Sequence, residues 1–254
     1  MIDLIVFSVG ENRYALNIEN VQRIIQAEEL TNIPNAHEYI DGMMSYEDKV
    51  IKVVNFRKLI DMPTYNNELD SLFTSLKIAH KDWVEALEVA LKDGSDFTKT
   101  FNPHACGLGK WIDSFTSYDD TVTAILNELI EYHKRLHRTG EVAYNLRTTD
   151  KEEALRIFKV DIKNIYEHTM GALNTFTSDL NIVVNSLQKF IIYDKGEKVF
   201  AIKVDTIEDI AHTKEDSFIN SSDEHNMNEF LELDGVLDLD NVLINVIKTV
   251  RLPS

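Results

Sequence analysis

The sequence predicts an α+β protein of several domains, in which a β-domain is split by an inserted antiparallel bundle of four helices. Two observations indicate this arrangement. A strand-like pattern near the start of the chain recurs near its end, and the chain between the two copies changes to a helical period. With 44% hydrophobic residues, the chain has enough apolar side chains for more than one core. We expect domain boundaries of 1–64, 65–188 and 189–254.

The internal repeat consists of two separate blocks. Residues 4–25 align without a gap with residues 190–211, and both segments contain a turn glycine. In the second block, residues 42–54 align with residues 235–247. Each block alternates apolar and polar residues, as the strands of a hairpin do. Hairpins can resemble one another by chance, but two blocks that recur in the same order favour one β-fold built twice.

The first predicted helix begins near residue 66. Its apolar residues recur at steps of three and four, which is the helical period. This stripe consists of Leu69, Leu72, Phe73, Leu76, His80, Trp83, Leu87 and Leu91. Turn residues in 92–103 predict a loop, and a short second helix follows through Trp111 to about Phe115.

The third predicted helix runs from about Asp119 to Leu146, and the fourth from about Asp150 to Ser186. Asp119 and Asp150 are the predicted N-caps, because an aspartate oxygen accepts hydrogen bonds from the free amides of a first helical turn. Helices of this kind bury their apolar stripes against one another, and four of them predict an antiparallel bundle.

The chain is acidic, with 43 Asp and Glu against 26 Lys and Arg and a formal net charge of −17. It has no basic stripe, so binding to nucleic acid or to an anionic membrane is not expected. We expect neither a signal peptide nor a membrane-spanning segment, since no run of about 20 apolar residues is present. The single cysteine favours a reducing, cytoplasmic location. The acidic segment 220–234 is interpreted as a solvated loop, with a partner-binding patch as the alternative.

Three histidines and the single cysteine form a candidate metal site. His133 and His137, in "EYHKRLH", are four residues apart and therefore share one face of the third predicted helix. They follow its apolar stripe, and His80 replaces an aliphatic residue on the stripe of the first helix, so all three imidazoles are predicted to point inward. Cys106 lies in "HACGLGKW". We predict that these four side chains converge.

Burial makes a shared ion the favoured explanation for this set of residues. An unsatisfied buried polar group costs about 1–3 kcal/mol, and an ion held in common removes that cost. Zn²⁺ accepts imidazole nitrogen and thiolate sulfur in tetrahedral geometry, so three histidines and one cysteine are a complete set of ligands. The alternative is that each is an ordinary core residue, the cysteine a small apolar group and the histidines hydrogen-bonded.

The neighbours of this site have expected supporting roles. Gly107 and Gly109 lack side chains and would let the segment of the cysteine approach the helices closely. Trp83 and Trp111 would shield the site from water, and His168 on the fourth helix would support the ligands without binding the metal. The remaining histidines, which are not expected to bind it, are His104 on the loop and His37, His212 and His225 in the β-halves.

Three motifs resemble the chemoreceptor zinc-binding domain, the CZB family: "HKDW" at 80–83, "CGLGKW" at 106–111 and "HKRLH" at 133–137. The likeness covers about 66–188. It implies a four-helix bundle that holds one Zn²⁺ per chain, and a cysteine that senses zinc or oxidants such as hypochlorous acid. The ligands that it implies are His80, Cys106, His133 and His137, with Gly109 and Trp111 as further motif residues.

The flanking segments resemble the chemotaxis coupling protein CheW, most clearly at 33–44 and 50–60. This resemblance implies a pair of five-stranded SH3-like β-barrels, which agrees with the internal repeat. It also implies that Arg57 lies at the receptor-binding surface, with Ile33 and Pro34 as further partner-binding residues.

Together the two resemblances imply a cytoplasmic signalling adaptor at chemoreceptor arrays, which couples the receptors to a CheA-type histidine kinase and is not an enzyme. The zinc site would modulate that coupling, and a homodimer through the bundle is left open. The chain departs from the family pattern at two places, and the second, the turn at 45–49, bears on receptor binding. Asn55 stands where an aspartate is usual, and "SYEDK" at 45–49 replaces a glycine turn.

Two other functions of the metal remain as alternatives. The zinc could be purely structural and brace the helical insertion. A zinc hydrolase would need three protein ligands and an open position for water. Here four donors fill the shell and no glutamate separates the histidines of "HKRLH", so a hydrolase is disfavoured.

Overall fold

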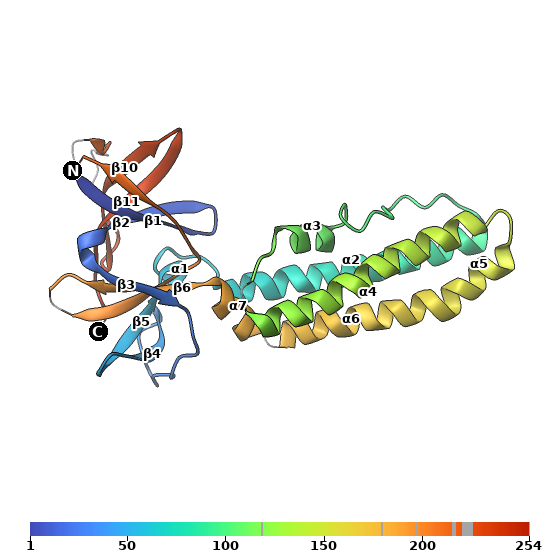
Figure 1. The fold of residues 1–254 in the computed structure, drawn as a ribbon, viewed down its shortest axis with the longest axis horizontal. Coiled ribbons are helices and arrows are strands. Elements are labelled where there is room, and N and C mark those ends of the chain that lie inside the picture. The colour runs from blue at the N-terminus through green and yellow to red at the C-terminus, as the bar shows by residue number, and fades with distance from the viewer. Residues whose placement is uncertain (118, 179, 197, 215–216, 220–225, 254) are drawn as a thin grey trace. The chain divides into compact units, whose positions relative to one another are not determined.

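The computed structural model describes residues 1–117, 119–178, 180–196, 198–214, 217–219 and 226–253. The chain forms two compact units, and Figure 1 labels most of their elements. The β-unit consists of residues 1–65 and 184–254, and the helical unit of residues 66–183. Among the described residues, no helix combines the length and the apolar character that crossing a membrane requires.

The β-unit is built from strands on both sides of the helices. Before the helices the chain forms β1 (Ile2–Val9), β2 (Asn12–Asn17), the 3-10 helix η1 (Ile18–Asn20), β3 (Val21–Gln26), β4 (Ile40–Tyr46), β5 (Lys49–Asn55) and the short helix α1 (Phe56–Leu59). After them it forms β6 (Lys189–Asp194), β7 (Val199–Val204), β8 (Thr206–Thr213), β9 (Asn226–Asn228), β10 (Leu231–Leu239) and β11 (Val242–Val250). The two sheets have the orders β8-β1-β2-β11-β10-β9 and β3-β6-β7-β5-β4. Each sheet combines strands from before and after the helices, so the helices interrupt one β-fold.

The two sheets reflect the internal repeat. β1, β2 and β3 correspond to β6, β7 and β8, and β4 and β5 correspond to β10 and β11. When each strand of the order β3-β6-β7-β5-β4 is replaced by its repeat partner, the result is β8-β1-β2-β11-β10. These are five successive strands of the other sheet. The third strand of each copy joins the opposite sheet, since β3 pairs with β6 and β8 pairs with β1. The prediction of five strands therefore holds for one sheet, whereas β9 adds a sixth strand to the other.

A glycine allows a close approach of the main chain in both copies of the repeat. A Cβ added to Gly42 would lie 2.7 Å from the carbonyl oxygen of Thr31. A Cβ added to Gly235 would lie 2.9 Å from the carbonyl oxygen of Ile219. Both positions therefore require a residue without a side chain, which explains why these glycines align in the sequence.

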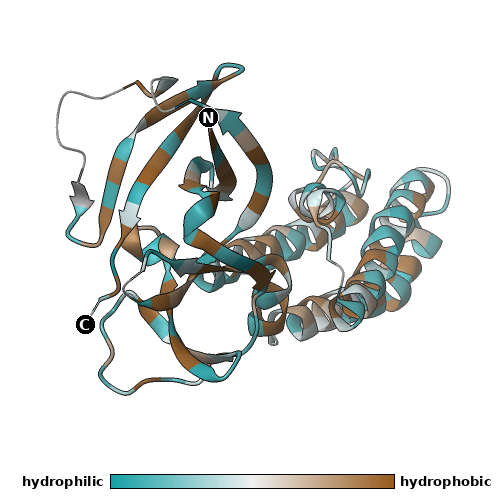
Figure 2. Ribbon diagram, turned by 60° about the vertical axis from the view of Figure 1, so that its left-hand side comes forward, coloured by the Kyte–Doolittle hydropathy of each residue, from teal (hydrophilic) through white to brown (hydrophobic). Residues whose placement is uncertain are grey.

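The largest core of the β-unit combines side chains from both sheets, and each sheet also has a smaller core of its own. Figure 2 shows apolar and polar residues alternating along the strands. The rings of Phe7, Tyr14 and Phe56 meet in this core, with centroids 4.8 to 5.8 Å apart. Phe56 belongs to α1, so the segment after β5 turns inward and contributes to the core.

The helical unit begins with one long helix and ends with a segmented one. Its elements are α2 (Tyr65–Asp93), α3 (Gly107–Ser114), α4 (Asp120–Leu146), α5 (Lys151–Ile157), the π-helix η2 (Phe158–Ile162), α6 (Lys163–Ser178) and α7 (Leu180–Leu187). The predicted N-caps are confirmed, since Asp119 accepts from the amide of Val122 at 2.9 Å and Asp150 accepts from the amide of Glu153 at 3.0 Å. The π-helical turn was not expected from the sequence.

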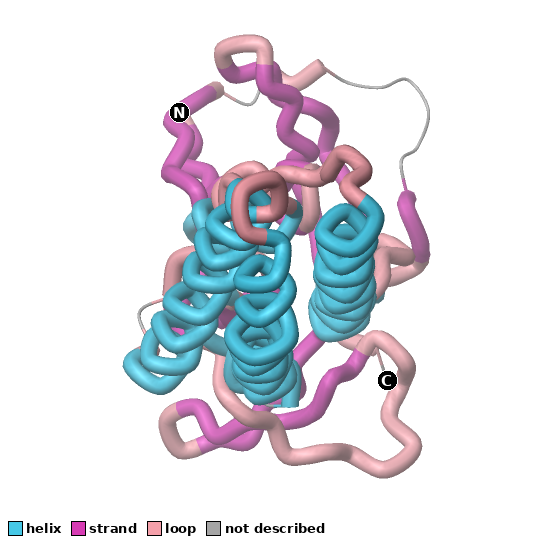
Figure 3. Tube along the Cα trace, turned by 90° about the vertical axis from the view of Figure 1, so that its right-hand side faces the viewer, coloured by secondary structure: helices cyan, strands magenta, loops and turns pink. Residues whose placement is uncertain are grey.

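The order of directions is up-down-up-down, as an antiparallel bundle requires. Residues 94–106 return along α2, since Trp83 donates to the carbonyl oxygen of Thr100 and the ring of Trp111 meets that of Phe73. α4 then runs in the direction of α2, and α6 runs in the opposite direction (Figure 1). The second pass of the chain along the bundle consists of the loop 94–106 and the eight-residue helix α3. Figure 3 shows the long helices side by side. The second helix of the bundle is therefore short, as the sequence predicts, and most of its path is taken by a loop.

Candidate metal centre

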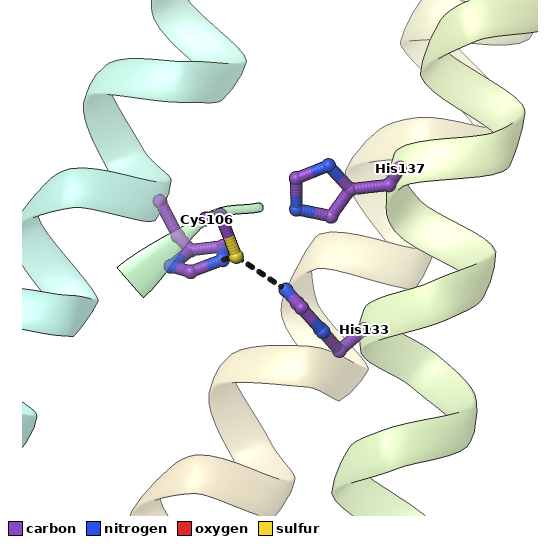
Figure 4. Close-up of side chains that lie close together, drawn as sticks. Cys106, His133 and His137 are labelled. Atoms are coloured by element: carbon purple, nitrogen blue, oxygen red, sulfur yellow. Dashed lines mark hydrogen bonds between the residues drawn. The ribbon is translucent and has the colours of Figure 1, made fainter. Parts of the chain in front are cut away.

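Four side chains meet inside the helical unit: His80 on α2, Cys106 at the start of α3, and His133 and His137 on α4. One donor atom from each lies within 4.8 Å of the others. The three imidazoles are buried, and the cysteine is half-buried. Figure 4 shows Cys106, His133 and His137 pointing toward one another. The structure therefore brings together the four residues that the sequence singles out as metal ligands.

The donor atom of His80 is directed by a hydrogen bond from the other nitrogen of its ring. Nδ1 of His80 lies 2.8 Å from the carbonyl oxygen of Leu76, to which it donates, so Nε2 is left with the free lone pair. The Cys106 Sγ atom lies 3.9 Å from Nε2 of His80 and 3.1 Å from Nε2 of His133. In a tetrahedral zinc site with bonds of about 2.0–2.3 Å, the ligand atoms stand roughly 3.3–3.6 Å apart. The two distances from Sγ lie on either side of this range, and all four donor atoms lie within 4.8 Å of one another.

The cysteine is held by the turn that begins α3. Cys106 is the N-cap of this helix, and its Sγ atom accepts from the amide of Gly109 at 3.3 Å. A Cβ added to Gly109 would lie 1.7 Å from the carbonyl oxygen of Pro103, so only glycine fits there. The same carbonyl oxygen accepts from the thiol at 3.3 Å. Gly107 has a lesser constraint, because its added Cβ would only meet the tip of the Leu76 side chain at 3.0 Å.

Burial sets the protonation of the cluster. Desolvation, together with the charges of neighbouring histidines, lowers the pKa of His133 to about 3. Desolvation, with the charge of His80, lowers the pKa of His137 to about 4, although the main chain of Thr100 and Phe101 opposes the shift. The pKa of His80 is lowered and that of Cys106 is raised, both mainly by burial. At neutral pH the cluster without metal therefore consists of neutral imidazoles and a neutral thiol.

The orphaned ring of His137 supports the fit to a metal. Both ring nitrogens are buried, and neither makes a well-formed hydrogen bond with any residue that the structure describes, although the main chain of Thr100 and Phe101 lies near the ring. Leaving such groups unsatisfied costs about 1–3 kcal/mol. A cation with tetrahedral preference would accept a lone pair from this ring and from its three neighbours. Three imidazole nitrogens and one sulfur suit Zn²⁺ better than Mg²⁺ or Ca²⁺, which prefer oxygen.

The predicted supporting residues have different outcomes. Trp83 is buried beside the site, and its ring centroid lies 4.9 Å from that of His137. Trp111 instead packs against Phe73, Phe115 and Phe176 in a separate aromatic group.

His168 was also predicted to support the ligands, and it lies on α6. It is exposed, its Nδ1 lies 2.8 Å from the carbonyl oxygen of Asn164, and its ring stacks on Tyr132. His104 is also exposed and pairs with Asp113 at 2.9 Å. His225 and residues 220–225 of the acidic segment lie outside the described residues.

Arg57, predicted at a receptor-binding surface, lies in the interior of the β-unit. Its side chain is 1% exposed and donates to both carboxylate oxygens of Asp205 at 2.7 to 3.0 Å. The partner-binding interpretation is therefore corrected, because a buried guanidinium that is already paired has no surface to offer. Ile33 packs partly against the core, and Pro34 is exposed.

Three contributors to the site were not expected from the sequence. The carbonyl oxygens of Leu76 and Pro103 orient His80 and Cys106. Gly140 is buried on the same face of α4 as the two histidines. Of these three, Gly140 could have been found from the sequence. It follows His137 by three residues and therefore lies on the same helix face as His133 and His137.

Two family models match the chain. The CheW-like domain matches residues 3–78, and the chemoreceptor zinc-binding domain matches residues 80–144. The second match contains the whole cluster of three histidines and one cysteine. Strands β6 to β11 lie outside the first match and belong to the β-unit through their pairing with strands inside it.

Curated relatives named chemotaxis protein CheW are similar to this chain. The Thermotoga maritima protein is 19% identical over 73 residues, which are 29% of this chain and 48% of that protein. The Bacillus subtilis protein is 29% identical over 79 residues, which are 31% of this chain and 49% of that protein. The chain thus spans about half the length of the curated relatives it matches. The crystal structure of the scaffolding protein TtCheW from Thermoanaerobacter tengcongensis has a TM-score of 0.46 at 12% identity, covering 98% of this chain and 90% of that one. Residues 3–78 are thus similar to a CheW-like domain, and residues 80–144 are similar to a chemoreceptor zinc-binding domain.

Proposed function

We propose that this chain is a chemotaxis signalling adaptor in which a zinc site modulates the coupling of chemoreceptors to a CheA-type histidine kinase. The observation that carries the proposal is the cluster of three histidines and one cysteine within the match to the chemoreceptor zinc-binding domain. That match follows a CheW-like one in a single chain. In this proposal the protein acts in the cytoplasm at receptor arrays and is not an enzyme. Sedimentation analysis would test whether two chains pair through the helical unit.

The proposed ligands of one Zn²⁺ per chain are His80, Cys106, His133 and His137. The bound ion would keep the sulfur as a thiolate and join α2, α3 and α4 at one point. The three imidazoles need no deprotonation to bind, because burial already keeps them neutral. The thiol must lose its proton when zinc binds. Because burial raises the pKa of the thiol, zinc binding at this ligand depends on pH.

Oxidation of Cys106 is the proposed route by which an oxidant acts on the site. The thiolate and hypochlorous acid give a sulfenic acid and chloride. A sulfur–oxygen bond forms and the oxygen–chlorine bond breaks, so that sulfur loses two electrons and chlorine gains them. The sulfenic acid is a poor ligand, so the segment of Cys106 would lose its bond to the helices. The chain has a single cysteine, and reversal therefore needs a thiol from another molecule.

The junctions of the helical insertion suggest how a change at the metal reaches the β-unit. Arg57 donates to the carbonyl oxygen of Pro63 at 3.0 Å, two residues before α2 begins. Gln188, the residue after α7, donates at 2.9 Å to Asp205, the ion-pair partner of Arg57. Both ends of the insertion are thus bonded to one ion pair. A state of the metal that favours one arrangement of these junctions would shift the population toward it.

A pull-down with the full chain tests the proposal. Receptor signalling fragments and the histidine kinase are recovered with metal-free, zinc-loaded and hypochlorite-treated protein. We expect recovery to differ among the three states, and the Cys106→Ala variant to bind zinc more weakly and to ignore hypochlorite. His168→Ala is the matched control, because that histidine is exposed on the same unit and outside the cluster. Equal recovery in all three states would remove modulation by the metal.

A purely structural zinc is the second candidate, favoured by the buried ring nitrogens of His137, which lack a well-formed hydrogen bond to any described residue. A cluster that is costly without an ion would make folding of the helical unit depend on metal. Circular dichroism during removal of zinc by a chelator separates the two candidates. Retention of helix with rapid exchange supports sensing, and collapse of the helices with slow loss of zinc supports bracing.

A further inference from the structure

Gly140 occupies a position of α4 where no side chain can fit. It is buried, and it follows His137 by three residues, so both lie on one face of the helix. A Cβ added there would lie 2.3 Å from Cη2 of Trp83 and 3.2 Å from Cζ2 of the same ring. It would also lie 3.1 Å from Cδ2 of Leu87. The indole of Trp83 therefore fills the space that the glycine leaves.

This indole cannot move aside without breaking other contacts. Trp83 is 4% exposed, and its Nε1 donates to the carbonyl oxygen of Thr100 at 2.8 Å. The rings of Phe97 and Phe101 meet it nearly at right angles, with centroids 5.4 and 5.9 Å away. A methyl group at position 140 would therefore displace a ring that is fixed by a hydrogen bond and two aromatic neighbours.

The same indole supports two parts of the metal cluster. It lies 4.9 Å from the ring of His137, whose nitrogens make no well-formed hydrogen bond with any described residue, so packing against Trp83 helps to orient that ligand. Through Thr100 it also holds the extended segment 94–106, which ends at Cys106. One side chain thus contacts a ligand on α4 and anchors the segment that carries the sulfur.

We propose that Gly140 is a positioning residue of the zinc site, which acts by giving Trp83 the place from which it orients His137 and anchors the segment of Cys106. The inference rests on the proposed zinc binding by the cluster. Groups that orient metal ligands typically contribute roughly 10- to 100-fold to affinity, and we expect Gly140→Ala to weaken zinc binding by that factor. The substitution should not reduce helix stability in itself, since alanine is the better helix former.

The test compares zinc affinity, measured by competition with a chromogenic chelator, with the thermal unfolding of the metal-free protein. Gly171→Ala is the matched control, because Gly171 is also helical and a Cβ there would meet nothing within 4 Å. The variant Trp83→Phe and the double variant Trp83→Phe/Gly140→Ala complete the set. A phenyl ring lacks the outer indole atoms that the new methyl group would meet, so the double variant should bind zinc as tightly as Trp83→Phe alone.

The outcomes separate this inference from the proposed function. If neither the wild-type protein nor Gly171→Ala binds zinc, the proposed function fails. If both bind and Gly140→Ala binds equally well, Gly140 has no positioning role and the zinc site stands. If Gly140→Ala does not fold, the double variant decides: zinc affinity equal to that of Trp83→Phe supports the inference. A double variant that is unfolded, or weaker than Trp83→Phe by the same factor, overturns it.

Discussion

Arg57 and Asp205 form a buried ion pair that holds the β-unit together across the helical insertion. The guanidinium donates to both carboxylate oxygens, and the residues are 148 positions apart in the sequence. Asp205 also accepts from the amide of Gly10 at 2.8 Å and from the side chain of Gln188. Such a fully bonded pair fixes the relative positions of the segments that carry it.

Arg57→Ala should destabilise the β-unit. Removing one partner of a buried ion pair costs about 3–5 kcal/mol, because the other charge is left unpaired. Both tryptophans, Trp83 and Trp111, lie in the helical unit, so their fluorescence reports that unit alone. We therefore measure the stability of the β-unit by hydrogen exchange of its strand amides, and we expect Arg57→Ala to lower their protection. Arg13→Ala is the control, since Arg13 forms an exposed pair with Glu208. Equal protection in the two variants would contradict this role for Arg57.

Zinc binding at neutral pH should release one proton per ion. Burial keeps the three imidazoles neutral, and it raises the pKa of the Cys106 thiol above its ordinary value of 9.0. The only proton that zinc must displace is therefore that of the thiol. Calorimetric titration in two buffers of different ionisation enthalpy gives the number directly. Cys106→Ala should release none, and release of more than one proton by the wild-type protein would mean that histidines are protonated before binding.

The metal-free helical unit should lose stability as the pH falls below 6.5. The pKa values of His80, His133 and His137 are lowered from 6.5 in the folded state, so the unfolded chain binds protons first. The stabilisation is present above pH 6.5 and is lost progressively down to about pH 3 to 4, where His133 and His137 titrate in the folded state. Each histidine contributes up to about 1.4 kcal/mol per pH unit in this window.

Tryptophan fluorescence during urea unfolding at a series of pH values, with a chelator present, measures this loss. His133→Leu removes one of the three proton sites and should reduce the slope of stability against pH. A slope that does not change in this variant would show that other groups dominate the acid sensitivity.

Gly109→Ala should abolish tight zinc binding, whereas Gly107→Ala should have a small effect. At position 109 the added methyl group meets main-chain atoms, with the carbonyl oxygen of Pro103 at 1.7 Å. At position 107 it meets the end of the Leu76 side chain, which can move. Zinc affinities of the two variants, measured under one condition, test the difference. Similar affinities would show that the turn before α3 is more adaptable than its packing indicates.

The metal cluster was accessible from the sequence because each ligand lies in a local pattern. His80, His133 and His137 interrupt apolar helical stripes, and their chemistry limits what could satisfy them. The repeat likewise predicted the paired sheets, since strand alternation is a local signal. The metal ligands and the strands could therefore be predicted from local periodicity and residue type.

The features that were missed depend on contacts between distant residues. The burial of Arg57 follows from Asp205, which no local pattern around either residue reveals. The loop before the short helix was predicted from its turn residues, but the packing of Phe97 and Phe101 against Trp83 was not. His168 follows an apolar stripe in the sequence, but its place on α6 faces solvent.

X-ray absorption at the zinc edge, combined with metal analysis of the purified chain, tests the central claim most directly. The account predicts one zinc per chain, with one sulfur at about 2.3 Å and three nitrogens at about 2.0 Å. In Cys106→Ala the sulfur contribution should disappear. A chain without stoichiometric metal, or a zinc bound to oxygen in place of sulfur, would contradict the account.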